Sequence, residues 1–243
     1  MLYILGMLPK IIEAQNKVLK ALTGRIDDFY LGGGTALSLF YFNHRESLDL
    51  DFFTKDFSKK RIVEIITALS ASLNRKIKLI SEESRKGKIK ILVYSLVIDR
   101  KDTLKIDFIE DYLDCIKPFK SVNGINILSL EDIYLRKIYA ATGTHQTTDY
   151  IGRKISEGGR QEAKDFYDLY CLSQIFMRLS DFSFRYGNQL IRESIIRWFR
   201  TYSRFEVKTG LLELKIKKDI NYPEIERHFK KEVDKIVEKI TES

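Results

Sequence analysis

The 243-residue chain has few of the residues that extracellular and membrane proteins depend on. Its two cysteines, Cys115 and Cys171, are too few and too widely spaced for a disulfide framework or a cysteine-based zinc site. The three histidines, His44, His145 and His228, lie far apart and show no ligand spacing either. No apolar run is long enough to span a bilayer, and the start, "MLYILGMLPK", lacks the features of a signal peptide. We therefore expect a cytoplasmic protein that does not contact a membrane.

Positive charge is in excess, with a net charge of +8, and it is concentrated in two blocks. Residues 59–105 contain thirteen Lys or Arg against five Asp or Glu, and residues 178–208 contain seven against three. Such clustering favours a polyanionic partner, although lysine-rich solvated faces would give the same composition. Charge therefore supports a nucleic-acid partner without identifying one.

The order of the expected elements divides the chain into two domains near residue 128. Helix and strand patterns are mixed before this point, whereas nearly every later segment has a helical pattern. The exception is a polar stretch over 142–159, "TGTHQTTDYIGRKISEGG", which we interpret as a long loop. The sequence predicts an α+β protein, with a mixed sheet and flanking helices over 1–128 and a helical domain over 129–243. The expected strands cover residues 28–32, 47–53, 76–81, 88–98, 104–110 and 125–129.

The stretch "LGGGTALSLFYFNHRESLDLDFF" stands apart from the rest of the chain. Three glycines precede a short helical segment, and two aspartates follow in a strand. Residues i and i+2 of a strand face the same way, so Asp49 and Asp51 project together. Asp107, in the strand "LKIDFIE", joins them if that strand pairs beside the first. Carboxylates at this spacing suit Mg²⁺ bound together with substrate phosphates.

The glycines fit the same chemistry. The backbone N–H groups of a glycine-rich turn that opens a helix bind phosphate oxygens, and Gly33 and Gly34 lie at such a turn. Each feature alone is commonplace, because a D-x-D is often a surface strand and a glycine run is often a loop. Their combination in this order favours phosphoryl transfer.

"GGGTAL" followed by "HRESLDLDFF" resembles the AbiEii/AbiGii toxin family of nucleotidyltransferases, in the DNA polymerase β-like superfamily. The resemblance covers roughly residues 30–170. It implies catalysis with one or two Mg²⁺ ions, an NTP substrate and a role as the toxin of a toxin–antitoxin or phage-defence pair. It places Asp49 and Asp51 at the metal, where strand alternation makes Asp107 the third candidate ligand. It identifies the following residues with nucleotide binding: Gly33, Gly34, Thr35, Arg45, Ser47, Asp165 and Asp168.

The helical half adds a buried cation of its own. Lys137 lies in the middle of an apolar stripe on the expected helix 130–141, where a lysine is rarely tolerated unless its ammonium meets an anion. The alternative is that its stem packs while its ammonium reaches water, but we favour an anion. That anion is either a substrate phosphate, which would make Lys137 catalytic, or a neighbouring carboxylate. Asp165 and Asp168, one turn apart on an apolar helix, are the candidate carboxylates, and Lys137 and Arg160 are their available partners. Lys137 also matches a lysine of the family.

Arginines mark a candidate RNA surface. Arg197, Arg200 and Arg204 fall at i, i+3 and i+7 on one face of an expected helix, a spacing that can follow a phosphate backbone. The alternative is that these arginines extend over apolar surface with their charges in water, or pair with Glu193 and Glu206. We expect an RNA acceptor, such as a tRNA end, because some relatives of this kind transfer nucleotides to tRNA. Two other hypotheses stay open: a non-catalytic RNA- or protein-binding module on the same fold, and an enzyme that modifies a protein or a small molecule.

Overall fold

The structure is a computed structural model that describes residues 10–85, 88–100, 102–148, 151–152, 154–218 and 220–242. The chain forms two compact units. The first contains the described residues up to Ala36 together with Ser47–Ser129, and the second contains Leu37–Glu46 and the described residues from Leu130 onward. The chain thus passes into the second unit for ten residues and returns. This excursion lies within the range that the sequence assigned to the N-terminal domain.

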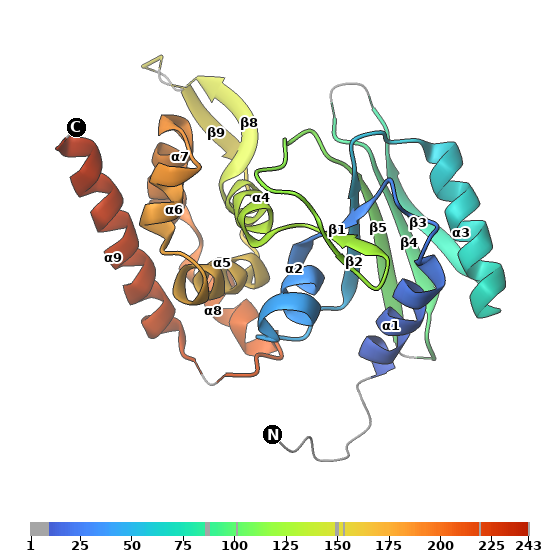
Figure 1. Ribbon diagram of the computed structural model, residues 1–243. Helices are drawn as coiled ribbons and strands as arrows, with labels where there is room; N and C mark the ends of the chain where they lie inside the picture. The colour runs from blue at the N-terminus through green and yellow to red at the C-terminus, as the bar shows by residue number, and fades with distance from the viewer. Residues whose placement is uncertain are drawn as a thin grey trace. The chain divides into compact units, whose positions relative to one another are not determined.

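A seven-stranded mixed sheet forms the centre of the first unit (Figure 1). Its strand order is β3-β4-β5-β2-β1-β7-β6. The pairs β1–β7 and β2–β5 are parallel and the other neighbours are antiparallel. The predicted α+β class with a mixed sheet is therefore confirmed. The strands are β1 (Tyr30–Leu31), β2 (Asp49–Thr54), β3 (Ile77–Glu83), β4 (Ile91–Val97), β5 (Thr103–Glu110), β6 (Lys120–Val122) and β7 (Ile125–Ile127).

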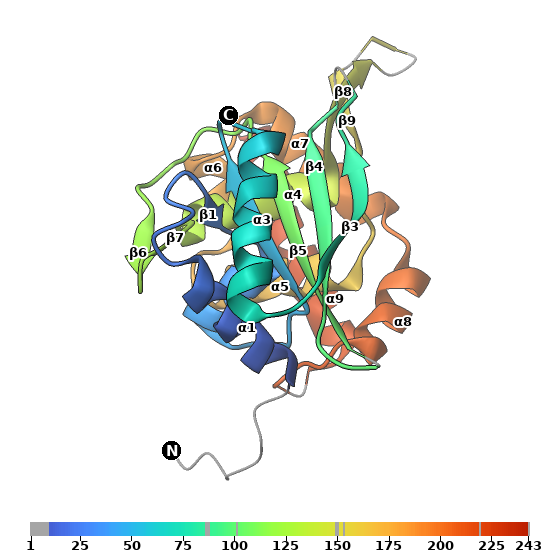
Figure 2. The ribbon, with the colours of Figure 1, turned by 90° about the vertical axis from the view of Figure 1, so that its right-hand side faces the viewer.

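Two helices, α1 (Lys10–Leu22) and α3 (Lys59–Leu73), lie side by side over one face of this sheet (Figure 2). Helix α3 begins where the sequence indicates, because the Ser58 side chain accepts a hydrogen bond from the Arg61 N–H and caps the helix. Apolar side chains alternate along the central strands, so that Leu50 and Phe52 are fully buried. Asp49 and Asp51, which alternate with them along β2, consequently project from the opposite face of the sheet.

A short helical segment follows the glycines, as expected, but its geometry changes along its length. It begins as α2 (Gly33–Ala36) and continues as a π-helix, η1 (Leu37–Phe42). The change coincides with the point at which the chain passes from the first unit into the second. A π-helix is rare and is often found near functional residues.

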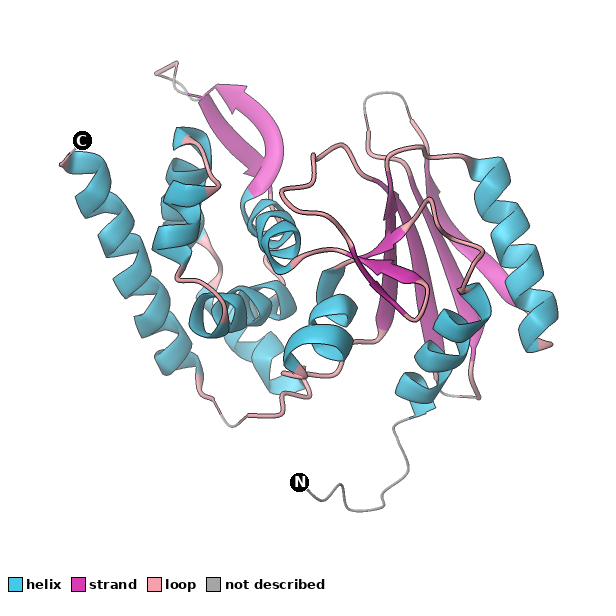
Figure 3. Cartoon of the chain, in the orientation of Figure 1, coloured by secondary structure: helices cyan, strands magenta, loops and turns pink. Residues whose placement is uncertain are grey.

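Helices make up most of the second unit, as Figure 3 shows. Helix α5 contacts α4, α8 and α9, and α9 packs along α6 and α7. The predicted loop over 142–159 is wrong in one respect: it contains an antiparallel hairpin of β8 (Gly143–Thr148) and β9 (Lys154–Gly158). The helices are α4 (Leu130–Thr142), α5 (Ala163–Ile175), α6 (Leu179–Arg185), α7 (Gln189–Thr201), α8 (Arg204–Glu213) and α9 (Tyr222–Thr241).

The arginine-bearing segment is two helices rather than one. Helix α7 ends at Thr201, and Ser203 caps a new helix, α8, by accepting a hydrogen bond from the Glu206 N–H. Arg197 and Arg200 therefore share a face of α7, whereas Arg204 is the first residue of α8. The predicted single helical face is wrong, because a serine followed by an acidic residue three positions on is a helix start.

In the part of the chain that the structure describes, no helix combines the length and the hydropathy that a membrane crossing requires.

Candidate active site and the buried ion network

Three carboxylates lie together on two neighbouring strands of the first unit. Strands β2 and β5 are parallel and paired so that Asp51 lies opposite Asp107 and Asp49 lies opposite Lys105. Paired residues of adjacent strands project from the same face, so all four side chains occupy one patch of the sheet. The structure therefore brings Asp107 to Asp49 and Asp51, as the sequence analysis required for a metal site.

The D-x-D strand is held at its start by two polar side chains. The buried Thr35 hydroxyl hydrogen-bonds the Asp49 carbonyl oxygen and lies 2.8 Å from the Ser47 hydroxyl. From α1, the Gln15 side chain donates to the Ser47 carbonyl oxygen at 2.8 Å. These bonds fix the backbone from which Asp49 projects, so Thr35 and Ser47 have a positioning role in addition to any contact with a nucleotide.

Both the backbone conformation of the turn and the neighbouring Asp51 carboxylate require a glycine at position 33. Its φ of 66° lies in the left-handed region, which glycine tolerates best. A Cβ at this position would overlap the carboxylate of Asp51. The backbone of the turn and the Asp51 side chain are therefore in close contact, and any other residue here would displace the aspartate.

Lys105 supplies the positive charge of this patch. Its ammonium lies 3.2 Å from Asp107 and 3.9 Å from Asp49. Burial would lower the pKa of Lys105, but the carboxylates of Asp107, Asp49 and Asp51 raise it above its ordinary value. The lysine therefore stays charged and offsets part of the repulsion among three neighbouring carboxylates.

The donor set of this patch fits Mg²⁺ in its chemistry. Mg²⁺ prefers carboxylate oxygens and is usually held by one or two of them together with water and substrate phosphates. Within the described residues, no group of three or more His, Cys, Asp or Glu side chains is arranged so that it could hold a metal ion by itself. Lys105 lies among the same carboxylate oxygens.

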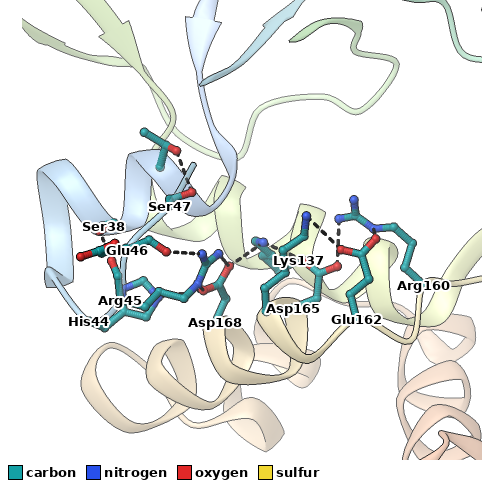
Figure 4. A network of polar contacts seen from close by, with 12 residues as sticks. Ser38, His44, Arg45, Glu46, Ser47, Lys137, Arg160, Glu162, Asp165 and Asp168 are labelled. Atoms are coloured by element: carbon teal, nitrogen blue, oxygen red, sulfur yellow. Dashed lines mark hydrogen bonds and ion pairs between the residues drawn. The ribbon is translucent and has the colours of Figure 1, made fainter. Parts of the chain in front are cut away.

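A chain of buried ion pairs forms the polar centre of the second unit (Figure 4). Asp168, whose side chain is fully buried, accepts hydrogen bonds from Nε and Nη2 of Arg45 at 2.6 and 2.8 Å. His44 Nε2 lies 2.7 Å from the same carboxylate. Arg45 also donates from Nη1 to the Glu46 carbonyl oxygen at 2.9 Å. These contacts tie the 37–46 segment to α5.

The network continues through Lys137 on α4. Its ammonium lies 2.6 Å from Asp168 and 2.7 Å from Asp165, and Asp165 in turn pairs with Arg160 at 2.9 Å. The sequence analysis considered two anions for Lys137, and in the structure its ammonium contacts the neighbouring carboxylates. The catalytic role of Lys137, and nucleotide binding by Arg45, Asp165 and Asp168, stay predictions.

The charges of this network stabilise one another against burial. Burial alone would raise the pKa of the Asp168 carboxyl, but Lys137 and Arg45 hold it well below its usual value. Burial would likewise lower the pKa of Lys137, yet Asp165 and Asp168 raise it. Asp168 and Lys137 therefore remain charged at neutral pH, and the loss of either would leave an uncompensated buried charge.

The arginines of the candidate RNA surface are all exposed. Arg200 and Arg204 line a groove of about 700 Å³ in the second unit, beside α9. Arg227 and Lys230 add positive charge to its walls, although Arg204 also pairs with Glu226 at 2.8 Å. The groove brings Arg200 and Arg204 together despite the helix break between them.

The sequence analysis assigns no role to three residues of these sites. Gln15 is a polar side chain on the apolar stripe of α1, three residues before Val18, and this spacing could have marked it. Lys105 shares its strand face with Asp107, which is visible from the alternation alone. His44 gives no such signal, because its partner Asp168 is 124 residues away.

The chain is similar to known proteins in sequence and in fold. The family model described as "Nucleotidyl transferase AbiEii toxin, Type IV TA system" matches residues 17–242. No curated protein matches the chain significantly. The crystal structure of JHP933 from Helicobacter pylori has a TM-score of 0.53 at 16% identity, over 96% of this chain and 94% of that one. A candidate nucleotidyltransferase from H. pylori also has a TM-score of 0.53 at 16% identity, over 93% and 95%. At 16% identity, the similarity to these two structures supports the same fold and nothing beyond it.

Proposed function

Because the chain belongs to the AbiEii family of nucleotidyl transferase toxins of type IV toxin–antitoxin systems, we propose that it transfers a nucleotide from an NTP to an RNA hydroxyl. The observation that carries the chemistry is the register of β2 and β5, which sets Asp49, Asp51 and Asp107 on one patch. Family membership implies the NTP substrate and a cognate antitoxin. The Mg²⁺ dependence and the RNA acceptor are our proposals.

The reaction is an in-line displacement at the α-phosphorus of the NTP. A bond forms between the acceptor oxygen and this phosphorus, the bond to the bridging oxygen breaks, and pyrophosphate leaves. A carboxylate of the patch takes up the proton of the acceptor hydroxyl. Asp49, Asp51 and Asp107 would hold Mg²⁺, which supplies activation of the hydroxyl and neutralisation of the phosphate charge.

The turn at Gly33 and Gly34 is proposed to receive the triphosphate through its backbone N–H groups. Its contact with Asp51 supports this, because phosphates bound at the turn would lie next to the carboxylate patch. Thr35 and Ser47 hold the turn and the strand start in a fixed relation. We assign them the positioning of the nucleotide site.

An RNA acceptor is supported by the exposed arginines and by the groove that Arg200 and Arg204 line. A positively charged groove can follow a phosphate backbone independently of sequence. The same lining contains three acidic residues, Glu226, Asp234 and Glu238, which weaken the case for tight binding. Weak binding suits a substrate that must leave after each turnover. A tRNA end is the acceptor we test first.

Labelled nucleotides test the proposal directly. The protein is incubated with each labelled NTP, Mg²⁺, total RNA and total protein, and the products are separated. Asp49→Asn and Asp51→Asn should each reduce transfer by about 100-fold or more, since they remove charge that acts in the transition state. Asp56→Asn, an exposed residue just after the same strand, is the control and should keep full activity.

The products separate the competing hypotheses. Label in RNA supports the proposal. Label in protein or in a small molecule would keep the chemistry and overturn the acceptor. Full transfer by Asp49→Asn or Asp51→Asn in samples that melt like the wild type would remove the carboxylate mechanism. No labelled product from any NTP would favour the non-catalytic binding module.

A further inference from the structure

Lys105 lies among the carboxylates that are proposed to hold Mg²⁺. It is paired opposite Asp49, and it comes two residues before Asp107 on the same strand face. Its ammonium contacts both of these carboxylates, at 3.9 and 3.2 Å. The lysine is therefore the cation that the patch already contains.

Two cations cannot share these oxygens without cost. A metal ion bound by Asp49 and Asp107 would stand within a few ångströms of the ammonium, and like charges at that separation repel each other. Lys105 can avoid this repulsion, because its side chain is 41% exposed and has a flexible stem. Metal binding would then require the lysine to leave its carboxylates.

We propose that Lys105 is a built-in counter-ion that holds the carboxylates in place before metal binds, lowers their affinity for metal alone, and passes to a phosphate oxygen when the nucleotide arrives. Metal and nucleotide binding are thereby coupled, since the triphosphate supplies the ammonium with a replacement partner. Coupling of this kind is reciprocal, so each ligand strengthens the binding of the other. This inference rests on the proposed function, because it takes Asp49, Asp51 and Asp107 as the metal ligands.

A purely structural salt bridge would behave differently. Its removal would destabilise the protein, but it would not change the factor by which a nucleotide strengthens metal binding. The counter-ion role instead requires that removing the charge strengthens the binding of metal alone and reduces this factor. The two roles thus predict different results for one substitution.

The experiment measures Mn²⁺ binding by calorimetry on the whole protein, first without nucleotide and then with a saturating non-hydrolysable NTP analogue. Lys105→Met should bind Mn²⁺ alone about 10-fold more tightly than the wild type, because a nearby repulsive charge is gone. The analogue should strengthen Mn²⁺ binding less in this variant than in the wild type. Lys105→Arg keeps the charge and should behave like the wild type.

Lys90→Met is the matched control. Lys90 lies on the same sheet, pairs with one carboxylate, Glu110, at 2.7 Å, and its side chain is 44% exposed. Its substitution should leave Mn²⁺ affinity unchanged. In EDTA, Lys105→Met should melt below the wild type, and saturating Mn²⁺ should raise its melting temperature more than that of the wild type.

The outcomes distinguish this inference from the proposed function. If the folded wild type binds no Mn²⁺, or if Asp49→Asn binds it as well as the wild type does, the proposed metal site fails. If the wild type binds Mn²⁺ and the affinity of Lys105→Met is unchanged or weaker, only the counter-ion role is overturned. A Lys105→Met protein too unstable to study in EDTA can be purified and melted with Mn²⁺ present. Failure of Mn²⁺ to rescue its melting would equally overturn the role.

Discussion

Lys137 is a buried cation with two carboxylate partners, and both its structural and its catalytic hypotheses can be tested by one substitution. Lys137→Met leaves Asp165 and Asp168 short of positive charge, so unfolding should become easier by about 3–5 kcal/mol. Its ammonium has three N–H donors and contacts two carboxylates, so the catalytic hypothesis requires the third donor to reach a substrate phosphate. If it meets one in the transition state, kcat should fall by about 100-fold at temperatures where the variant is folded.

Glu232→Gln is the control for the loss of stability. Glu232 is another buried carboxylate of the same unit, where it accepts hydrogen bonds from the N–H and the hydroxyl of Ser180. Its substitution should lower the melting temperature without touching the ion network. Transfer should be normal below that temperature. Normal turnover by folded Lys137→Met would show that the lysine is an ion-pair partner and has no catalytic role.

At the scale of elements, the break between α7 and α8 changes the expected contributions of the three arginines. Arg197 and Arg200 project from α7, whereas Arg204 opens α8 and is partly neutralised by Glu226. Replacing Arg197 and Arg200 together with glutamine should weaken RNA binding and reduce the slope of log affinity against log salt by about 2 if each contacts one phosphate. Arg204→Gln alone should have a smaller effect, because its charge is already offset.

Filter binding across a series of salt concentrations measures both quantities, and NTP binding should stay at the wild-type level. Arg185→Gln, a basic residue in the last turn of α6, is the control for total charge. An unchanged salt slope in the double variant would remove this surface as the acceptor site. A protein or small-molecule acceptor would then be favoured.

The same elements show what a single sequence can predict. The carboxylates of β2 follow from a local rule, since side chains alternate along a strand, and the Ser58 cap follows from another. No local rule predicts which strand lies beside β2, because the pairing of β2 with β5 joins residues more than fifty positions apart. The hairpin of β8 and β9 was missed because "GTHQTT" has no apolar alternation. The pairing of Arg45 with Asp168 was not predicted, because the two residues are distant in the chain.

The whole molecule consists of two units that the chain visits alternately, and its single tryptophan reports on one of them. Trp198 lies in α7 of the second unit, buried against Phe166 and Phe229 with ring centroids 5.6 and 5.3 Å away. Its fluorescence should therefore follow the unfolding of the second unit. The stability of that unit depends in turn on the charge of Asp168.

The final prediction concerns acid unfolding of the second unit. The folded-state pKa of Asp168 is depressed, so its contribution to stability is fully present well above its unfolded pKa of about 3.9 and is lost as the pH falls through the folded value. In urea titrations followed by Trp198 fluorescence, the wild type should lose stability steeply below about pH 4. Asp168→Asn should be less stable at neutral pH, by about 3–5 kcal/mol, because Arg45 and Lys137 are left with less negative charge.

Asp168→Asn should also depend less on pH in the acid range, because one titrating group is gone from the folded state. The pKa of Glu232 is lowered as well: burial alone would raise it, but the hydrogen bonds from Ser180 outweigh that effect. Part of the acid dependence should therefore persist. Asp234→Asn, on the exposed face of α9, is the control and should follow the wild-type curve. A curve for Asp168→Asn parallel to the wild type between about pH 5 and pH 2 would mean that the acid lability of this unit arises from groups other than the Asp168 network.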